Sequence, residues 1–278
     1  MFSLIASTFI TFSPHIIIFI YYSQIFRYNK IYKIDKPIIL LHIKWFYENE
    51  YINIINKPAL QSFGFGTKVD LVYTFEDLYK NLSVDLFASI KTFGQTELKY
   101  TLDYDAVKTF LEVRFNNLPT HSFSLNGSPS ESFNFRASID SGKDLSVNEE
   151  IPEVGKLKSS FLSLNFQVND NLIINPSLRY SKLERLDGSG NYFEGNIARL
   201  NVRYQFSNAF NIRLISQKNT FTNQFFIQPL VQWNPNPSTI FYFGGNQNTI
   251  EEIEGAHFQL LQFNQTQFFF KFQYLIGL

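Results

Sequence analysis

The chain has 278 residues, of which 45% are hydrophobic and 18% aromatic, and its 24 basic side chains balance 24 acidic ones. This length allows one large domain or two small ones with ample material for a core. Zero net charge excludes a nucleic-acid binder that works by neutralising phosphates, and the high apolar content excludes a disordered acidic chain. Because the sequence has no cysteine, disulfides, thiolate metal sites and cysteine nucleophiles are excluded as well.

The first sixty residues differ from the rest in composition. Residues 1–26 contain no charged side chain, which fits a transmembrane helix or a long signal sequence. Pro14 interrupts this run, however, and basic residues come only after it, from Arg27 onward. Three interpretations of residues 1–60 stay open: an export or anchoring segment, non-native sequence ahead of a truncated gene product, or additional strands, for example at residues 37–46.

From about residue 66 to the end, apolar and polar side chains alternate with a period of two. In residues 68–76, for example, Val69 and Leu71 fall on one face while Lys68 and Asp70 fall on the other. This alternation is typical of strands with one apolar face, and it recurs in about thirteen segments after residue 60. We find no segment there with a convincing helical period, so the sequence predicts an all-β chain.

Two architectures produce this alternation. A soluble sandwich points its apolar side chains inward, whereas a transmembrane barrel points them at lipid and encloses the polar ones. The segments run for roughly 9–11 residues, which is the length that a tilted strand needs to cross a bilayer. Aromatic residues at segment ends, such as Tyr204, Phe206 and Trp233, suit an interfacial girdle. These features favour the membrane barrel.

The connections between the segments are uneven in length. If the last strand descends to the periplasm, residues 169–171, 207–209 and 234–238 become short periplasmic turns. The longer polar connections at residues 140–155, 184–191 and 248–265 then lie at the opposite rim. Short periplasmic turns and longer outer loops are the arrangement of outer-membrane barrels.

The C-terminal segment carries an apolar residue at every second position up to the end of the chain. This pattern resembles the assembly signal of bacterial outer-membrane barrels, and the alternative is an ordinary C-terminal core strand. The residues of this predicted signal are Phe268, Phe270, Phe272, Tyr274, Ile276 and Leu278.

Residues 195–247 and 265–278 together resemble the end of a Bacteroidetes-type family of outer-membrane proteins of unknown function. Members of that family typically carry a carbohydrate-binding sandwich of the family nine type ahead of a C-terminal barrel, and some are labelled membrane-associated hydrolases. The resemblance is specific over about residues 157–278 and plausible back to about residue 62. It implies a membrane-embedded barrel. It transfers no glycan-binding or hydrolytic role, because no sandwich precedes the barrel in this sequence.

The sequence contains little that is typical of catalysis or metal binding. It has no HExxH spacing and no G-x-S-x-G nucleophile elbow, so we expect no enzymatic activity, no metal and no cofactor. The acidic residues Glu251, Glu252 and Glu254 near His257 could hold Ca²⁺, but a solvated loop is the better interpretation. The segment from Asp187 to residue 191 likewise fits a flexible hairpin loop better than a calcium turn.

The polar face of the later strands is the one candidate for contact with a solute. Adjacent strands would place several of its donors and acceptors at similar depth, lining a lumen that could bind sugars or pass small polar solutes. A polar plug that only stabilises the barrel explains the same residues. The predicted lumen-lining set is Arg199, Arg203, Gln205, Arg213, Gln217, Gln228, Gln232, Lys271 and Gln273.

Together these observations predict a transmembrane antiparallel β-barrel of about 12–14 strands, possibly incomplete, over residues 61–278, preceded by the apolar segment of residues 1–60. The expected location is the bacterial outer membrane. The expected partners are outer-membrane lipid, the barrel-assembly machinery and a glycan or small polar solute, with no nucleic acid. The expected role is a membrane-embedded module associated with carbohydrate binding or uptake. The alternatives are a hydrolase component whose catalytic or binding domain is missing, and a soluble periplasmic β-sandwich.

Overall fold

All the elements of the computed structural model of the protein are β-strands. The structure describes residues 8–11, 17–23, 40–55, 57, 59–74, 79–111, 113–147, 151–252 and 260–275. These residues form one antiparallel sheet of 15 strands, in which each strand pairs with its neighbours in the sequence. The prediction of an all-β chain is therefore confirmed.

The strands follow one another along the chain with short connections. Their bounds are β1 (Thr8–Thr11), β2 (Ile17–Ser23), β3 (Leu40–Ile54), β4 (Ser62–Thr74), β5 (Tyr79–Thr92), β6 (Thr96–Phe110), β7 (Val113–Ser130), β8 (Phe133–Leu145), β9 (Val154–Gln167), β10 (Leu172–Arg185), β11 (Asn191–Ser207), β12 (Phe210–Asn219), β13 (Gln224–Asn236), β14 (Thr239–Glu252) and β15 (Leu260–Tyr274).

Most strands are longer than the alternating segments from which they were predicted. Strand β12 has 10 residues but β7 has 18, against the predicted length of roughly 9–11. The excess lies at the strand ends, where the hydrogen-bonded ladder continues beyond the alternating segments. The predicted loop at residues 140–155 shrinks for this reason, because β8 extends to Leu145 and β9 begins at Val154.

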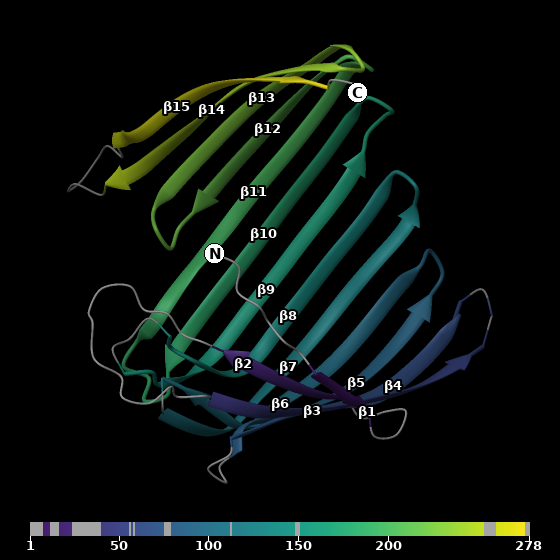
Figure 1. The fold of residues 1–278 in the computed structure, drawn as a ribbon, viewed down its shortest axis with the longest axis vertical. Coiled ribbons are helices and arrows are strands. Elements are labelled where there is room, and N and C mark those ends of the chain that lie inside the picture. Colours follow the sequence, from purple (N-terminus) through teal and green to yellow (C-terminus); the bar gives the residue numbers. More distant parts are fainter. Residues whose placement is uncertain are drawn as a thin grey trace.

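The sheet is strongly curved and open. Figure 1 shows β4 to β11 side by side across the middle of the molecule, with β12–β15 at one end and β1–β3 at the other turned at an angle to them. The strand order begins at β1 and ends at β15, so in the described part of the chain these two edge strands do not pair with each other.

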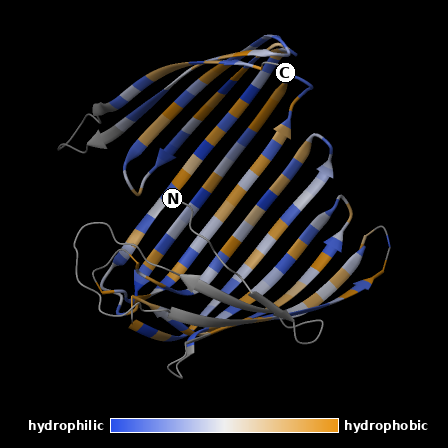
Figure 2. Ribbon diagram, in the orientation of Figure 1, coloured by the Kyte–Doolittle hydropathy of each residue, from blue (hydrophilic) through white to orange (hydrophobic). Residues whose placement is uncertain are grey.

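The strands have one apolar and one polar face, and the register joins each face across the sheet. Hydrophobic and hydrophilic residues alternate along the strands in Figure 2. Leu86 pairs with Leu102, and Val231 pairs with Phe243. The apolar face contains, strand by strand from β4 to β15, Phe65, Leu86, Leu102, Phe123, Ile139, Leu162, Leu178, Leu200, Leu214, Val231, Phe243 and Phe270; the polar face contains Lys68, Asp85, Asp103, Ser122, Asp140, Ser159, Arg179, Arg199, Gln217, Gln228, Tyr242 and Lys271.

The apolar face is the more exposed of the two in β7 and β8, whereas in β11 the polar-face residues Arg199 and Arg203 are exposed as well. In β7, Phe123 is 54% exposed while Ser122 and Ser124 are half-buried. In β8, Ile139 is 62% exposed while Asp140 is half-buried. Side chains on the concave side of a curved sheet crowd together and those on the convex side spread apart. We therefore assign the polar face to the concave side.

Only small groups of apolar side chains are fully enclosed in the described residues. One cluster joins Phe115, Leu118 and Leu145 at one end of β7 and β8, with Phe110 and Val154 packed against it. Val107, Leu183 and Ile215 are also buried, and among them Leu183 has no exposed surface. It covers Gly155 so closely that a Cβ on that glycine would lie 2.7 Å from Leu183 Cγ. The core is therefore local, and no dry centre unites the sheet.

Strand β3 extends the sheet into residues 1–60. It pairs with β4 from His42–Thr74 to Ile54–Ser62. It overlaps the additional strand expected at residues 37–46 and continues to Ile54. Most of the uncharged run of residues 1–26 lies outside the described residues. Within the described residues, no helix has the length and hydropathy needed to cross a membrane.

Leu183 offers a test of this local core. Replacing Leu183 with Ala should lower the free energy of unfolding by about 2–5 kcal/mol, since the change leaves a cavity over Gly155. Leu178 on the same strand is 47% exposed, so Leu178→Ala is the matched control and should cost clearly less. Urea unfolding in detergent micelles measures both. Equal losses would contradict the enclosed position of Leu183.

Candidate functional site

The nine residues predicted to line a lumen all lie on the polar face of β11, β12, β13 and β15. The register makes Arg199 the partner of Gln217 and Arg203 the partner of Arg213. The other predicted residues lie on the same face of their strands. They are Gln205, opposite Asn211; Gln228, opposite Ile215; Gln232, opposite Asn211 and Tyr242; Lys271, opposite Tyr242; and Gln273, opposite Ile240.

The predicted residues fall into separate groups along this face rather than one cluster. Arg203 and Arg213 are direct cross-strand partners, whereas Arg199 lies four residues away on β11, which is about 13 Å along an extended strand. On the far edge, the Lys271 ammonium lies 5.7 Å from the centre of the Tyr242 ring. Near one strand end, Gln232 Nε2 donates a hydrogen bond to Asn234 Oδ1 at 3.2 Å.

Buried polar atoms without a partner concentrate on the same face. Arg213 Nε and the Oδ1 atoms of Asn175 and Asn201 are shielded from solvent and accept or donate no hydrogen bond. Asn175 and Asn201 are cross-strand partners. Buried polar atoms are nearly always hydrogen-bonded in proteins, either to protein groups or to ordered water, so these atoms can bind water or a solute.

Acidic residues gather on the other part of the polar face, on β4, β5 and β6. Asp85 is the cross-strand partner of Asp103, and lysines accompany them. Lys68 Nζ lies 3.1 Å from Asp70 Oδ2 and 3.9 Å from Asp85 Oδ2. Asp70 and Asp85 therefore have a basic neighbour within ion-pair distance. The polar face thus divides into an acidic part with its own counter-charges and a basic part on β10, β11 and β12.

One pocket on the polar face was not predicted from the sequence. It has a volume of about 350 Å³ and polar walls, and its lining includes Asn126, Arg136 and Phe161. Arg136 Nε donates to Asn126 Oδ1 at 3.2 Å, which holds the guanidinium against β7. Gln95, from the turn between β5 and β6, forms a further wall. Alternation places Arg136 on the polar face, but only the register and that turn bring these walls together.

The predicted assembly signal lies on the edge strand β15. Phe268, Phe270, Phe272 and Tyr274 are on the apolar face and between 54% and 76% exposed. Phe272 packs on Phe241, with ring centres 5.1 Å apart. The last two members of the set, Ile276 and Leu278, lie outside the described residues.

Other candidates from the sequence have structural roles or cannot be placed. Asp187 Oδ1 accepts hydrogen bonds from the Ser189 backbone N–H and hydroxyl. These bonds hold the pKa of the Asp187 carboxyl below its ordinary value, and they use the carboxylate to shape the hairpin turn. The acidic segment with Glu254 and His257 lies outside the described residues. Among the residues that are described, no cluster of potential metal ligands forms.

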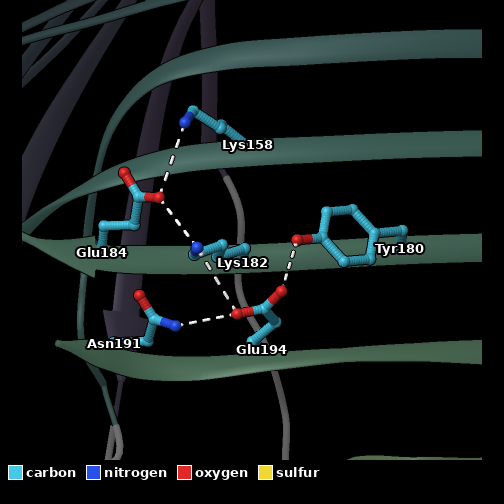
Figure 3. Close-up of polar contacts among 6 residues, drawn as sticks. All are labelled: Lys158, Tyr180, Lys182, Glu184, Asn191 and Glu194. Carbon is cyan, nitrogen blue, oxygen red and sulfur yellow. Dashed lines mark hydrogen bonds and ion pairs between the residues drawn. The ribbon is translucent and has the colours of Figure 1, made fainter.

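A polar network lies on the opposite surface of the sheet, where the apolar face ends. Lys182 Nζ lies 2.9 Å from Glu184 Oε1 and 3.4 Å from Glu194 Oε2, so one ammonium joins two carboxylates across β10 and β11 (Figure 3). Tyr180 donates to Glu194 at 2.9 Å and Asn191 does so at 2.8 Å. Together with Lys158, which lies 3.5 Å from Glu184 Oε1, these residues form what we term the hairpin network. It marks the level at which the outward surface changes from apolar to charged.

The hairpin network predicts a local effect of removing its central cation. Lys182→Met should leave Glu184 and Glu194 facing each other without the ammonium between them, so the end of the β10–β11 hairpin should open more often. Hydrogen exchange of the backbone amides near residue 185 measures this opening, and exchange should become faster. The double variant Lys182→Met with Glu184→Gln should recover most of the protection. If the single variant exchanges at the original rate, the network does not hold this hairpin end.

No protein-family model matches the chain, and no curated protein matches its sequence.

Proposed function

We propose that the protein is a β-barrel of the bacterial outer membrane whose apolar face contacts lipid and whose polar face surrounds a hydrated interior. In this proposal, the chain is a membrane-embedded module that binds or passes small polar solutes, glycans among them. The proposal includes a relationship between the C-terminal part of the chain and the Bacteroidetes-type outer-membrane family that this part resembles.

The observation that carries this proposal is the inverted distribution of side chains. Large apolar residues, many of them more than a third exposed, line one face of the sheet from β4 to β15, and the other face is mostly polar. Monomeric soluble proteins rarely expose contiguous apolar patches larger than a few hundred Å². A soluble sandwich would enclose Phe123, Ile139 and Phe270, yet these residues are 54%, 62% and 66% exposed. Lipid is the environment in which such a surface is stable.

Strand length and the placement of aromatic residues support the same conclusion. A tilted strand crosses the hydrocarbon core with about 9–11 residues, and β4 to β15 all reach that length. Tyr204 and Phe206 pack edge to face, with ring centres 4.5 Å apart, and Phe206 lies 5.4 Å from Phe210. Phe210 in turn pairs with Trp233 on the next strand. Aromatic rings at one level of neighbouring strands are typical of a membrane interface.

The edge strand β15 fits recognition by the barrel-assembly machinery. The strand lies at one edge of the sheet. The backbone groups on its outer side therefore face no strand of the described chain. An extended edge can be recognised by pairing with another strand, while alternate side chains provide specificity. Backbone groups cannot stay unsatisfied in hydrocarbon, so the proposal requires β15 to find a partner strand once it is inserted.

Two neighbouring phenylalanines on β15 provide the test. Phe270 is on the apolar face opposite Phe243, and Phe269 is on the polar face opposite Gly244. Phe270→Arg should cost about 1–3 kcal/mol, because it puts a charge into lipid between the aromatic interface and the middle of the bilayer. Phe269→Arg makes the same change at nearly the same depth but points the charge at the hydrated interior, so its cost should be much smaller.

The measurement is the fraction of chain that folds into lipid vesicles and migrates faster on an unheated gel than on a heated one. The wild type should show this heat-dependent shift, Phe270→Arg should lose most of it, and Phe269→Arg should keep it. Equal losses in the two variants would refute the assigned faces. A wild-type chain that is soluble without detergent and shows no shift would instead identify a soluble periplasmic sandwich.

A further inference from the structure

Two arginines face each other directly on the polar face of β11 and β12. Arg203 and Arg213 are cross-strand partners, which brings their Cα atoms to within about 5.5 Å. Like charges directly opposite each other on a sheet destabilise it. The side chain of Arg203 is exposed and that of Arg213 is half-buried. Water screens this repulsion, and an anion bound between the two guanidinium groups would turn it into attraction.

The protein provides no such counter-charge among its described residues. On β9 to β13, the polar face carries no acidic side chain, and neither arginine forms an ion pair. The acidic pair of Asp85 and Asp103 is different, because Lys68 lies 3.9 Å from Asp85. A lysine therefore partly compensates the acidic pair, whereas no ion pair among the described residues compensates the arginine pair.

The surroundings of the arginine pair are suited to an oxyanion. Arg213 Nε is buried and has no hydrogen-bond partner. Next to it on the same face, Asn201 has a buried oxygen that is also without a partner, and Asn211 lies two residues from Arg213 along β12. Each guanidinium presents several N–H donors in a planar fork that matches two oxygens of a carboxylate, sulfate or phosphate. Amide side chains beside the forks can bind the hydroxyl groups of the same solute.

We propose that Arg203 and Arg213 form a binding site for an oxyanion group, and that the solute of the polar face is a hydroxyl-rich molecule bearing such a group. This inference rests on the proposed function, since the polar face must enclose water that solutes can reach. It narrows the class of solute from small polar molecules in general to acidic ones, such as a saccharide with a carboxylate or sulfate group.

The test uses the full chain folded in detergent micelles, with calorimetric titration in buffer of low chloride content. The probes are sodium sulfate, sodium glucuronate and, as the neutral control, glucose. Sulfate and glucuronate should bind, and glucose should bind at least about tenfold more weakly, because guanidinium forks favour charged oxygens. Binding of glucuronate over sulfate would identify the hydroxyl groups as part of recognition, and the reverse order would identify a bare oxyanion site.

Arg213→Glu separates binding from folding. It turns the like-charge pair into a cross-strand ion pair with Arg203, so the variant should fold at least as well as the wild type while sulfate binding falls by about tenfold or more. Arg213→Lys keeps the charge but not the fork, and should bind several-fold more weakly than the wild type. The control is Arg179→Gln on the polar face of β10, where the guanidinium lies over the Phe161 ring at 4.9 Å; its sulfate affinity should stay within about twofold.

Two outcomes would overturn the inference while leaving the proposed function intact. In one, the folded wild type shows the heat-dependent gel shift but binds neither anion. In the other, Arg213→Glu binds sulfate as the wild type does. A chain that does not show the gel shift at all would refute the proposed function, and the oxyanion site would fall with it.

Discussion

The antiparallel hydrogen-bonded ladder is the constraint on which the rest of the structure depends. Each internal strand pairs with both of its sequence neighbours, so the register of one hairpin determines which residues of the next strand share a face. Because side chains alternate with a period of two, a slip by one residue would move a whole apolar set to the other surface. In the pairs Leu86–Leu102, Leu162–Leu178 and Val231–Phe243, for example, apolar side chains of neighbouring strands share one face.

This ladder explains why the sheet can exist with so little enclosed apolar volume. A soluble domain of this length would hold its strands together mainly by burying side chains in a shared core. Here the enclosed groups in the described residues are local, for example Leu183 over Gly155 and the cluster around Leu118. The remaining cohesion comes from the ladder itself and from lateral contacts between neighbouring rings, such as Trp233 on Phe241 at 5.3 Å. Lateral contacts of this kind leave the outer surface free to meet another apolar medium.

The sequence predicts features that depend on neighbours along one strand and misses those that depend on register. Alternation is local, so the strands, their two faces and the common face of the nine polar residues follow from it. The positions of the strand ends do not follow from alternation. At the end of β10, for example, Lys182 and Glu184 continue the strand through polar contacts, which leave no alternating pattern in the sequence. The direct opposition of Arg203 and Arg213 requires the exact length of the turn at residues 208–209. The pocket beside Arg136 requires Gln95 from another hairpin, and no local pattern contains that information.

The distribution of charges on the polar face indicates that water reaches this face, whether or not a solute is bound. Two facing guanidinium groups without a carboxylate would repel each other strongly in a dry interior, where the effective dielectric constant is low. The unpartnered amide oxygens of Asn175 and Asn201 would cost further free energy there, because a buried polar atom without a hydrogen bond loses its hydration. Water or a dissolved anion removes both costs. A channel or a binding cavity needs a concave face that stays hydrated. A sheet packed against other elements does not need such a face. The same arginines, which would destabilise a dry core, are therefore consistent with the proposed arrangement, in which the apolar residues on the other face of the sheet contact lipid.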